Sequence, residues 1–167
     1  IRKYNIKFNT SIFHAEDHPF TMKAYLHTNS ISIVNDYDCY YWTKYTDGNR
    51  TQLTKQIIDV NKFYDYFYET LNVIQNADLP NDLIVLAAYK YWRRLLLLDL
   101  PIEFRRPRNI EDKYLSFNIA SSIAKEYITD QIYKHFIDNF GKEKLILDIL
   151  LDGSYRIMED YIRLDRK

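Results

Sequence analysis

Residues 59–77 read DVNKFYDYFYETLNVIQNA, and this stretch has the periodicity of an amphipathic helix. Asp59, at its start, is a residue type that commonly caps the first turn of a helix. The apolar residues recur at spacings of three and four, so one helix face would carry Val60, Phe63, Phe67, Leu71 and Ile74. The stretch therefore predicts a helix that begins after Asp59 and ends near Ala77.

Two longer helical patterns follow this stretch. The first opens with Leu79-Pro80-Asn81-Asp82, and we expect Pro101 to end it because proline interrupts the hydrogen bonds of a helix. The second begins at Asn109, where Asp112 stands in a capping-box-like position, and we expect it to end before Gly141. This part of the chain is therefore predicted to be two helices joined by a loop that contains prolines and arginines.

The tail, residues 142–167, has the pattern of two shorter helices separated at Asp152-Gly153. The apolar residues that carry this pattern are Leu145, Ile149 and Leu150 in the first helix and Ile157, Tyr161 and Leu164 in the second.

The first third of the chain has a different pattern. Apolar residues alternate around Ile31 and Ile33 and again along residues 39–45, and alternation with period two is typical of strands. The pair Asp47-Gly48 is typical of a hairpin turn. We therefore predict an α+β fold that is predominantly α, in which residues 56–167 form a bundle of four or five helices and residues 1–55 a β hairpin or small antiparallel sheet.

Composition indicates one soluble globular domain, residues 1–167, because 47% of the residues are hydrophobic and 28% are charged. Lysine plus arginine equals aspartate plus glutamate, 23 of each, so no overall field attracts a polyanion or a membrane surface. The apolar stretch from Leu83 to Leu100 is interrupted by Lys90, Arg93 and Arg94, which argues against a membrane span.

The single cysteine, Cys39, excludes an internal disulfide and favours an intracellular, reducing compartment, either the cytoplasm or an organelle interior. A lone cysteine is more often a small apolar residue than a nucleophile. The 16 tyrosines and 3 glycines are typical of an AT-rich genome, and three scattered glycines exclude a glycine-rich nucleotide-binding loop. We predict no cofactor. The start at Ile1 leaves room for a leader, a targeting peptide or an upstream region that was removed.

His14 and His18 are the first candidates for a metal site, because two histidines four residues apart share one face of a helix. Pro19 interrupts the helix that this spacing needs, and a third ligand would have to come from His27, Cys39 or nearby carboxylates. The pattern therefore favours a solvated polar loop without a metal.

A cluster of basic residues is interleaved with Tyr89, Tyr91 and Trp92, and arginines beside aromatic rings can bind phosphates and stack on bases. Zero net charge and the common pairing of arginine with acidic helices weigh against that interpretation. The candidate phosphate-binding residues are Lys90, Arg93, Arg94, Arg105, Arg106 and Arg108.

Aromatic residues also lie on every side of the predicted helix and on both faces of the predicted strand. One small core covers only one side of each element, so some of these rings would remain outside it. Tyrosine and tryptophan dominate many protein interfaces. The candidate interface residues are Tyr40, Trp42, Tyr64, Tyr66 and Tyr68. The sequence therefore favours a non-enzymatic interaction protein or accessory subunit of a larger complex or homo-oligomer, with a nucleic-acid- or phosphate-binding protein as the alternative. An enzyme ranks third, because no catalytic residues stand out.

Overall fold

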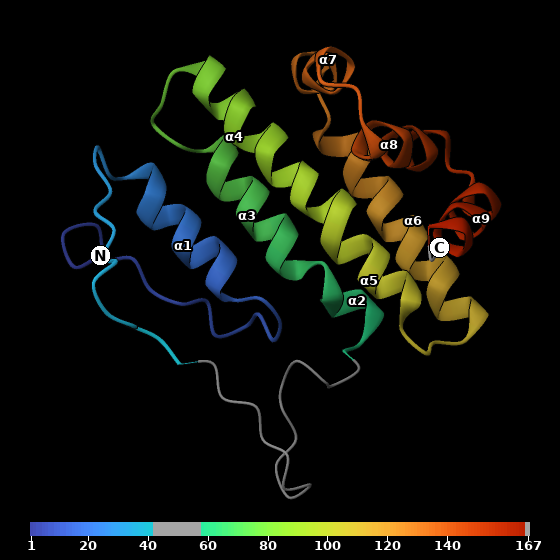
Figure 1. Ribbon diagram of the computed structural model, residues 1–167, viewed down its shortest axis with the longest axis horizontal. Helices are drawn as coiled ribbons and strands as arrows, with labels where there is room; N and C mark the ends of the chain where they lie inside the picture. The colour runs from blue at the N-terminus through green and yellow to red at the C-terminus, as the bar shows by residue number, and fades with distance from the viewer. Residues whose placement is uncertain (42–57, 166–167) are drawn as a thin grey trace, which may run out of the picture.

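The computed structural model describes residues 1–41 and 58–165. The elements, in chain order, are α1 (Asp17–Leu26), α2 (Val60–Phe63), α3 (Asp65–Gln75), α4 (Asn81–Arg94), the π-turn η2 (Leu95–Asp99), α5 (Leu100–Arg105), α6 (Ile110–Tyr127), α7 (Asp130–Asp138), α8 (Lys142–Asp152) and α9 (Tyr155–Leu164). Helices α1, α3 and α4 lie side by side, and α6, α8 and α9 lie beyond α4 (Figure 1), where α8 contacts η2 and α6, and α9 contacts α5.

The predicted N-terminal β hairpin or sheet is wrong for the residues that the structure describes, because residues 1–41 and 58–165 contain no strand. Helix α1 lies within the part that was expected to be β-rich, and residues 30–41 are irregular. Ile31 and Ile33 are 69% and 84% exposed. Alternating apolar and polar residues show only that a segment would fit on a sheet with one buried face. A strand also needs a partner strand to form its hydrogen bonds. The Asp47-Gly48 turn and Trp42 lie outside the described residues.

Two predicted helix starts are confirmed by their caps. The Asn61 amide donates to Asp59 Oδ1 at 2.8 Å, and the Asp112 amide donates to Asn109 Oδ1 at 2.7 Å. Both helices are shorter than predicted. The first is interrupted at Tyr64, which divides α2 from α3.

The long helix expected from Asn109 to Gly141 is divided into α6 and α7. The interruption falls at Ile128, where the backbone is extended. The Thr129 hydroxyl accepts a hydrogen bond from the Ile132 amide at 3.3 Å and so caps α7. Thr129 followed by Asp130 is a helix-start pattern that could have been recognised in the sequence.

Pro101 does not end its helix, contrary to prediction, because the helix widens just before it. The Leu100 amide donates to the Leu95 carbonyl, five residues back, which defines the π-turn η2. Pro101 then occupies the first turn of α5, where a missing N–H leaves no helical hydrogen bond unmade. The helical path therefore continues to Arg105.

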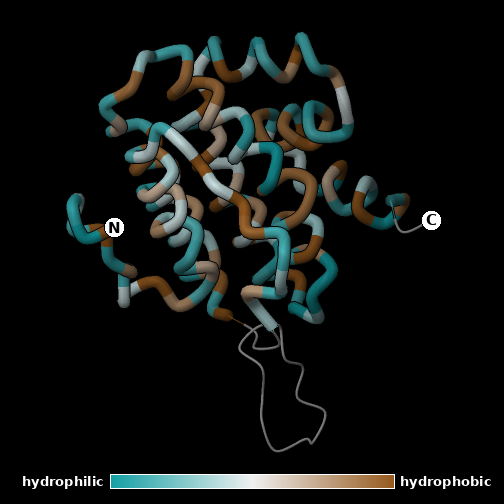
Figure 2. The backbone as a smooth tube through the Cα atoms, turned by 60° about the vertical axis from the view of Figure 1, so that its left-hand side comes forward, coloured by the Kyte–Doolittle hydropathy of each residue, from teal (hydrophilic) through white to brown (hydrophobic). Residues whose placement is uncertain are grey.

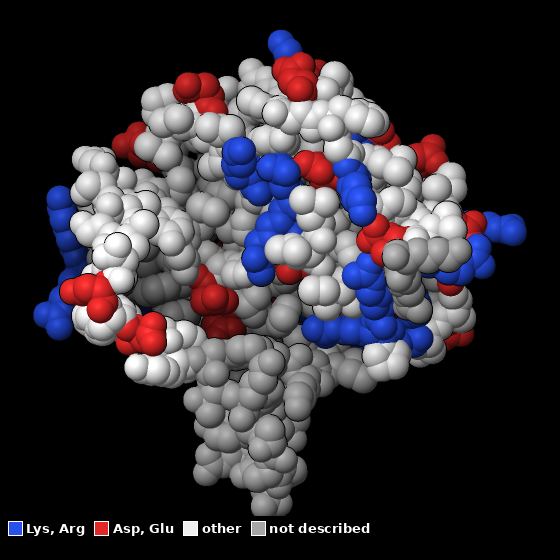
Figure 3. Space-filling model, viewed as in Figure 1, with Lys and Arg blue, Asp and Glu red and all other residues white. Residues whose placement is uncertain are grey.

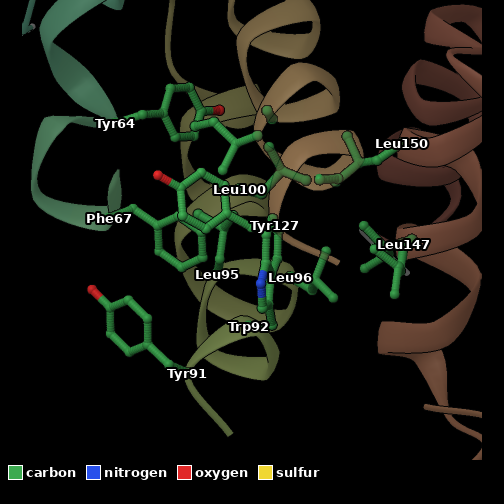
Figure 4. Packing of buried hydrophobic residues seen from close by; sticks show 14 of the residues in the cluster. Tyr64, Phe67, Tyr91, Trp92, Leu95, Leu96, Leu100, Tyr127, Leu147 and Leu150 are labelled. Atoms are coloured by element: carbon green, nitrogen blue, oxygen red, sulfur yellow. The ribbon is translucent and has the colours of Figure 1, made fainter. Parts of the chain in front are cut away.

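The core surrounds the end of α4 and η2. Trp92, Leu95, Leu96 and Leu100 have no exposed surface, and Phe67 from α3 packs its ring edge against Trp92 at 4.8 Å between centroids (Figure 4). Along the helices, hydrophobic and hydrophilic residues alternate in short blocks (Figure 2), which is typical of helices with one buried face.

The predicted break between α8 and α9 is confirmed. Gly153 has a φ of 80°, a left-handed conformation that glycine adopts readily at a helix end. Of the apolar residues that carried the pattern of α8, Ile149 and Leu150 are buried, whereas Leu145 is exposed.

The apolar pattern of α9 matches its buried side only in part: Met158 and Ile162 are the buried residues, and Tyr161 packs partly buried against the core. Ile157 and Leu164 are 53% and 64% exposed. Apolar residues of α9 therefore also occur on the side that faces solvent.

Among the residues that the structure describes, no helix is both long enough and apolar enough to cross a membrane.

Candidate functional site

The start of α1 gathers polar side chains that lie far apart in the sequence. Ala15, two residues before it, has a φ of 51°, a left-handed conformation that is uncommon outside glycine and recurs at functional sites. His14 and His18 flank this turn. The His14 ring stacks on Phe63 at 5.1 Å, and the His18 ring meets the Tyr66 ring edge-on at 5.0 Å. Both histidines therefore pack against the α2–α3 region.

Two sets of polar contacts lie near α1: one joins α1 to α4, and the other joins α3, α4 and η2. His18 Nδ1 lies 3.0 Å from the Tyr91 hydroxyl of α4. The Tyr66 hydroxyl donates to Asp99 Oδ2 at 2.9 Å, and Arg94 Nε lies 3.4 Å from the same oxygen. The Tyr66 and Arg94 contacts hold Asp99 in place, and the His18–Tyr91 contact joins α1 to α4.

A pocket of about 240 Å³ opens between α1 and α4. Figure 3 shows a hollow on this face with acidic side chains inside it and lysine and arginine side chains along its right-hand side. The pocket is lined by Asp17, His18, Thr21, Met22, Tyr25, Tyr91 and Arg94. One pocket therefore brings together a carboxylate, an imidazole, a phenol and a guanidinium group, the side-chain types that commonly act in proton transfer and anion binding.

Burial shifts the pKa values of the histidine and tyrosine side chains at this site. It lowers the pKa of His18, with a further lowering from the Arg94 charge, and it lowers the pKa of His14, with a further lowering from Arg106. Burial also raises the pKa values of Tyr66 and Tyr91, and the Asp99 charge acts in the same direction. At neutral pH the two imidazoles are therefore neutral and the two phenols are protonated.

The histidine pair does not assemble a metal site in the described part of the chain. No group of three or more histidine, cysteine, aspartate or glutamate side chains there is close enough to hold a metal ion. Cys39 is exposed, and His27 contacts the Lys23 carbonyl instead.

The six candidate phosphate-binding residues do not form one free basic patch. Each of the five arginines lies beside a carboxylate: Arg93 beside Glu143, Arg94 beside Asp99, Arg105 beside Asp165, and Arg106 and Arg108 beside Glu103. Lys90 is exposed on α4. The acidic partners come from α5, α8, η2 and the end of α9, which sequence spacing could not reveal.

Glu103 is the centre of a buried ion cluster, with only 1% of its surface exposed. Arg106 Nε lies 3.3 Å from one carboxylate oxygen, and Arg108 Nε contacts the other. Arg108 Nη2 also donates to the Ile58 carbonyl at 2.5 Å. Arg106 and Arg108 thus hold the loop after α5 in place, which is a structural role.

The candidate interface tyrosines divide into buried and exposed residues. Tyr64 and Tyr66 are 2% and 0% exposed, so neither ring can contact another chain while this fold persists. Tyr68 is 36% exposed and Tyr40 is 81% exposed. The α2–α3 region buries more rings than expected because α1 covers one side of it and α6 covers another.

No known family model matches the chain, and no solved structure matches it. The chain is 31% identical over 113 residues to a poly(ribitol-phosphate) beta-glucosyltransferase of Bacillus spizizenii, a match that covers 68% of the chain and 16% of that enzyme. It is 35% identical over 79 residues to a poly(ribitol-phosphate) beta-N-acetylglucosaminyltransferase of Staphylococcus aureus, covering 47% of the chain and 13% of the enzyme. The chain thus spans less than a fifth of these relatives and is similar to one part of two bacterial glycosyltransferases.

Proposed function

We propose that this chain is part of a glycosyltransferase that transfers a sugar to a hydroxyl group of a polyol-phosphate polymer. The observation that carries the proposal is the 31% identity over 113 residues to an enzyme whose name states this chemistry. Residue patterns alone favoured a non-enzymatic subunit, because no catalytic motif stands out in the sequence. The similarity to enzymes is a stronger argument than the absence of a recognisable catalytic motif.

The pocket at the start of α1 offers the groups that such a transfer needs. The acceptor oxygen forms a bond to the sugar C1 while the bond from C1 to the leaving group breaks, and a base takes the proton of the acceptor hydroxyl. Asp17 is the exposed carboxylate of this pocket, and we assign it as the base. Arg94 offers a positive charge to a phosphate of the acceptor or of the leaving group.

His18 acts beside Asp17 as a positioning residue. Its imidazole is neutral, because burial lowers its pKa, and the Tyr91 hydroxyl at 3.0 Å holds the ring in place. A neutral imidazole held in this way orients the acceptor hydroxyl group. Because the ring carries no positive charge, it does not compete with Arg94 for a phosphate.

The test is an assay of the natural protein that contains this chain, at its full length. Poly(ribitol phosphate) is incubated with nucleotide-activated, radiolabelled glucose or N-acetylglucosamine, and label in the polymer is counted. We expect transfer of one of the two sugars, and we expect Asp17→Asn to lower kcat by about 10² to 10⁴ because the base is lost.

The matched control is Asp160→Asn, which neutralises an exposed carboxylate on α9 that contacts Arg163. Its rate should equal that of the unchanged protein, and the melting temperatures of both variants should agree. The proposal is overturned if neither sugar reaches the polymer, or if Asp17→Asn is as active as the control.

A second candidate function is docking to another protein, as the sequence predicted. Tyr37, Tyr40 and Tyr41 favour it, because 68%, 81% and 76% of their surfaces are exposed close together in the sequence. Sedimentation velocity of the protein and of a variant with all three tyrosines changed to serine tests this function. A higher oligomer that the variant loses supports docking, and a monomer with no change contradicts self-association through these rings.

A further inference from the structure

A second groove lies between the α2–α3 region and α6, and its described lining residues are a different set from those of the α1 pocket. Its volume is about 470 Å³, within the range of roughly 300 to 1,000 Å³ typical of small-molecule sites. Its polar lining consists of Asn61, Asp65, Tyr68, Asn118, Ser122 and Glu126. The groove is therefore large enough for one or two sugar units.

Helix geometry gives the groove polar edges and an apolar floor. Asn118, Ser122 and Glu126 are spaced four residues apart, so they follow one line along α6. Ile119 and Ile123 line the groove on the same helix, and Ile123 is 3% exposed. A ligand with hydroxyl groups around an apolar ring face matches this arrangement.

Tyr68 forms an aromatic wall that is fixed in position. Its hydroxyl donates to Glu126 Oε2 at 2.6 Å, and its ring meets the Tyr127 ring edge-on at 5.1 Å. The Tyr127 hydroxyl in turn donates to Asn72 Oδ1 at 2.9 Å. Because 36% of Tyr68 remains exposed, its ring offers a surface that needs little further ordering when a ligand arrives.

The charges of the groove select against anions. Asp65 and Glu126 line it, and among the described residues no lysine or arginine does so. The carboxylates and the Asn61 and Asn118 amides accept hydrogen bonds from hydroxyl groups, and the amide nitrogens also donate. We propose that this groove binds a neutral sugar, with one ring face against Tyr68 and the hydroxyl groups on the polar edges. This inference goes beyond the proposed transfer reaction, because binding here needs neither Asp17 nor catalysis.

The experiment is an NMR titration of the isotope-labelled protein with methyl β-glucopyranoside, with N-acetylglucosamine and, as the anionic comparison, with inorganic phosphate. We expect a neutral sugar to shift amide signals of residues 61–68 and 118–126 in a saturable way, and phosphate to leave these signals unchanged. Tyr68→Ala should weaken binding about tenfold, because the ring surface is lost.

The matched control is Tyr114→Ala, which removes a 53% exposed tyrosine from α6, a helix that lines the groove, at a position outside it. It should bind as the unchanged protein does, as should Asp17→Asn. Asn118→Ala changes an exposed side chain and gives a second measurement if Tyr68→Ala fails to fold; it should weaken binding severalfold. The inference is overturned if neither sugar shifts these signals, if phosphate shifts them as strongly, or if the groove variants bind like Tyr114→Ala. Sugar binding without any transferase activity would contradict the proposed function and leave this inference standing.

Discussion

Residues 1–41 and residues 58–165 place their large apolar side chains differently. In the first region Ile6, Ile12 and Pro19 are the buried residues. The exposed large apolar residues there are Ile1, Tyr4, Phe8, Phe13, Tyr25, Ile31, Ile33, Val34, Tyr37, Tyr40 and Tyr41. In the second region most aromatic rings lie inside. A high aromatic content therefore does not itself define a docking surface, since the packing of neighbouring helices decides which rings remain exposed.

The largest difference between the two regions should appear when one ring is removed from each. Trp92→Ala leaves a cavity at a site with no exposed surface, and we expect a loss of about 3 to 5 kcal/mol in the free energy of unfolding. Tyr40→Ala changes a ring that is 81% exposed and should alter stability by less than about 0.5 kcal/mol. Urea unfolding followed by circular dichroism measures both. Equal losses would contradict the contrast between the regions.

A second prediction concerns charge inside residues 58–165. Glu103→Gln keeps the side-chain shape but removes the negative charge between Arg106 and Arg108, and we expect a loss of about 3 kcal/mol. Thermal unfolding measures it. The control is Asp160→Asn, whose partner Arg163 is exposed, and its effect should stay below about 1 kcal/mol. A Glu103 variant as stable as the control would show that burial does not strengthen this cluster.

The smallest effect should be a pH dependence where the two regions meet. His14 and His18 have pKa values below the ordinary 6.5, whereas the unfolded chain keeps the ordinary value. Below pH 6.5 the unfolded state therefore binds more protons, so stability is complete above that pH and falls as the pH drops toward the folded values.

Urea midpoints measured at several pH values between about 5 and 8 test this dependence. The double variant His14→Gln, His18→Gln should flatten the curve, whereas His27→Gln, at an exposed position, should leave its slope unchanged. An unchanged slope in the double variant would mean that other groups cause the pH dependence.

Local signals in the sequence predicted local structure correctly. The caps at Asp59 and Asn109 and the break at Gly153 depend on residues within one turn of each other, and all three are confirmed. Pro101 was misinterpreted because its tolerance depends on η2, a widening that residue types alone do not specify. The alternation around Ile31 was misinterpreted because a strand depends on a distant partner.

The candidate site was only partly visible in the sequence. The spacing of His14 and His18 indicated a possible metal site. The basic residues around Arg94 indicated a possible phosphate-binding site. Asp17, between the two histidines, counted only as one of the nearby carboxylates that could supply a third metal ligand. The contacts that join these groups run through Tyr91 and Asp99, more than 70 residues from the start of α1, and only folding brings them together.

The π-turn η2 makes this protein sensitive to chain length at one point. A π-turn holds one residue more than a regular helical turn, so deleting one leucine from residues 95–98 would let the helix close regularly while the residues after it keep nearly the same face. Pro101 would then lie where a regular helix requires an N–H. Such a deletion alters neither net charge nor apolar character, yet it would place a proline inside a regular helix, which costs about 3 kcal/mol. In natural variation, a gain or loss of one residue here should therefore be rarer than exchange of one leucine for another apolar residue.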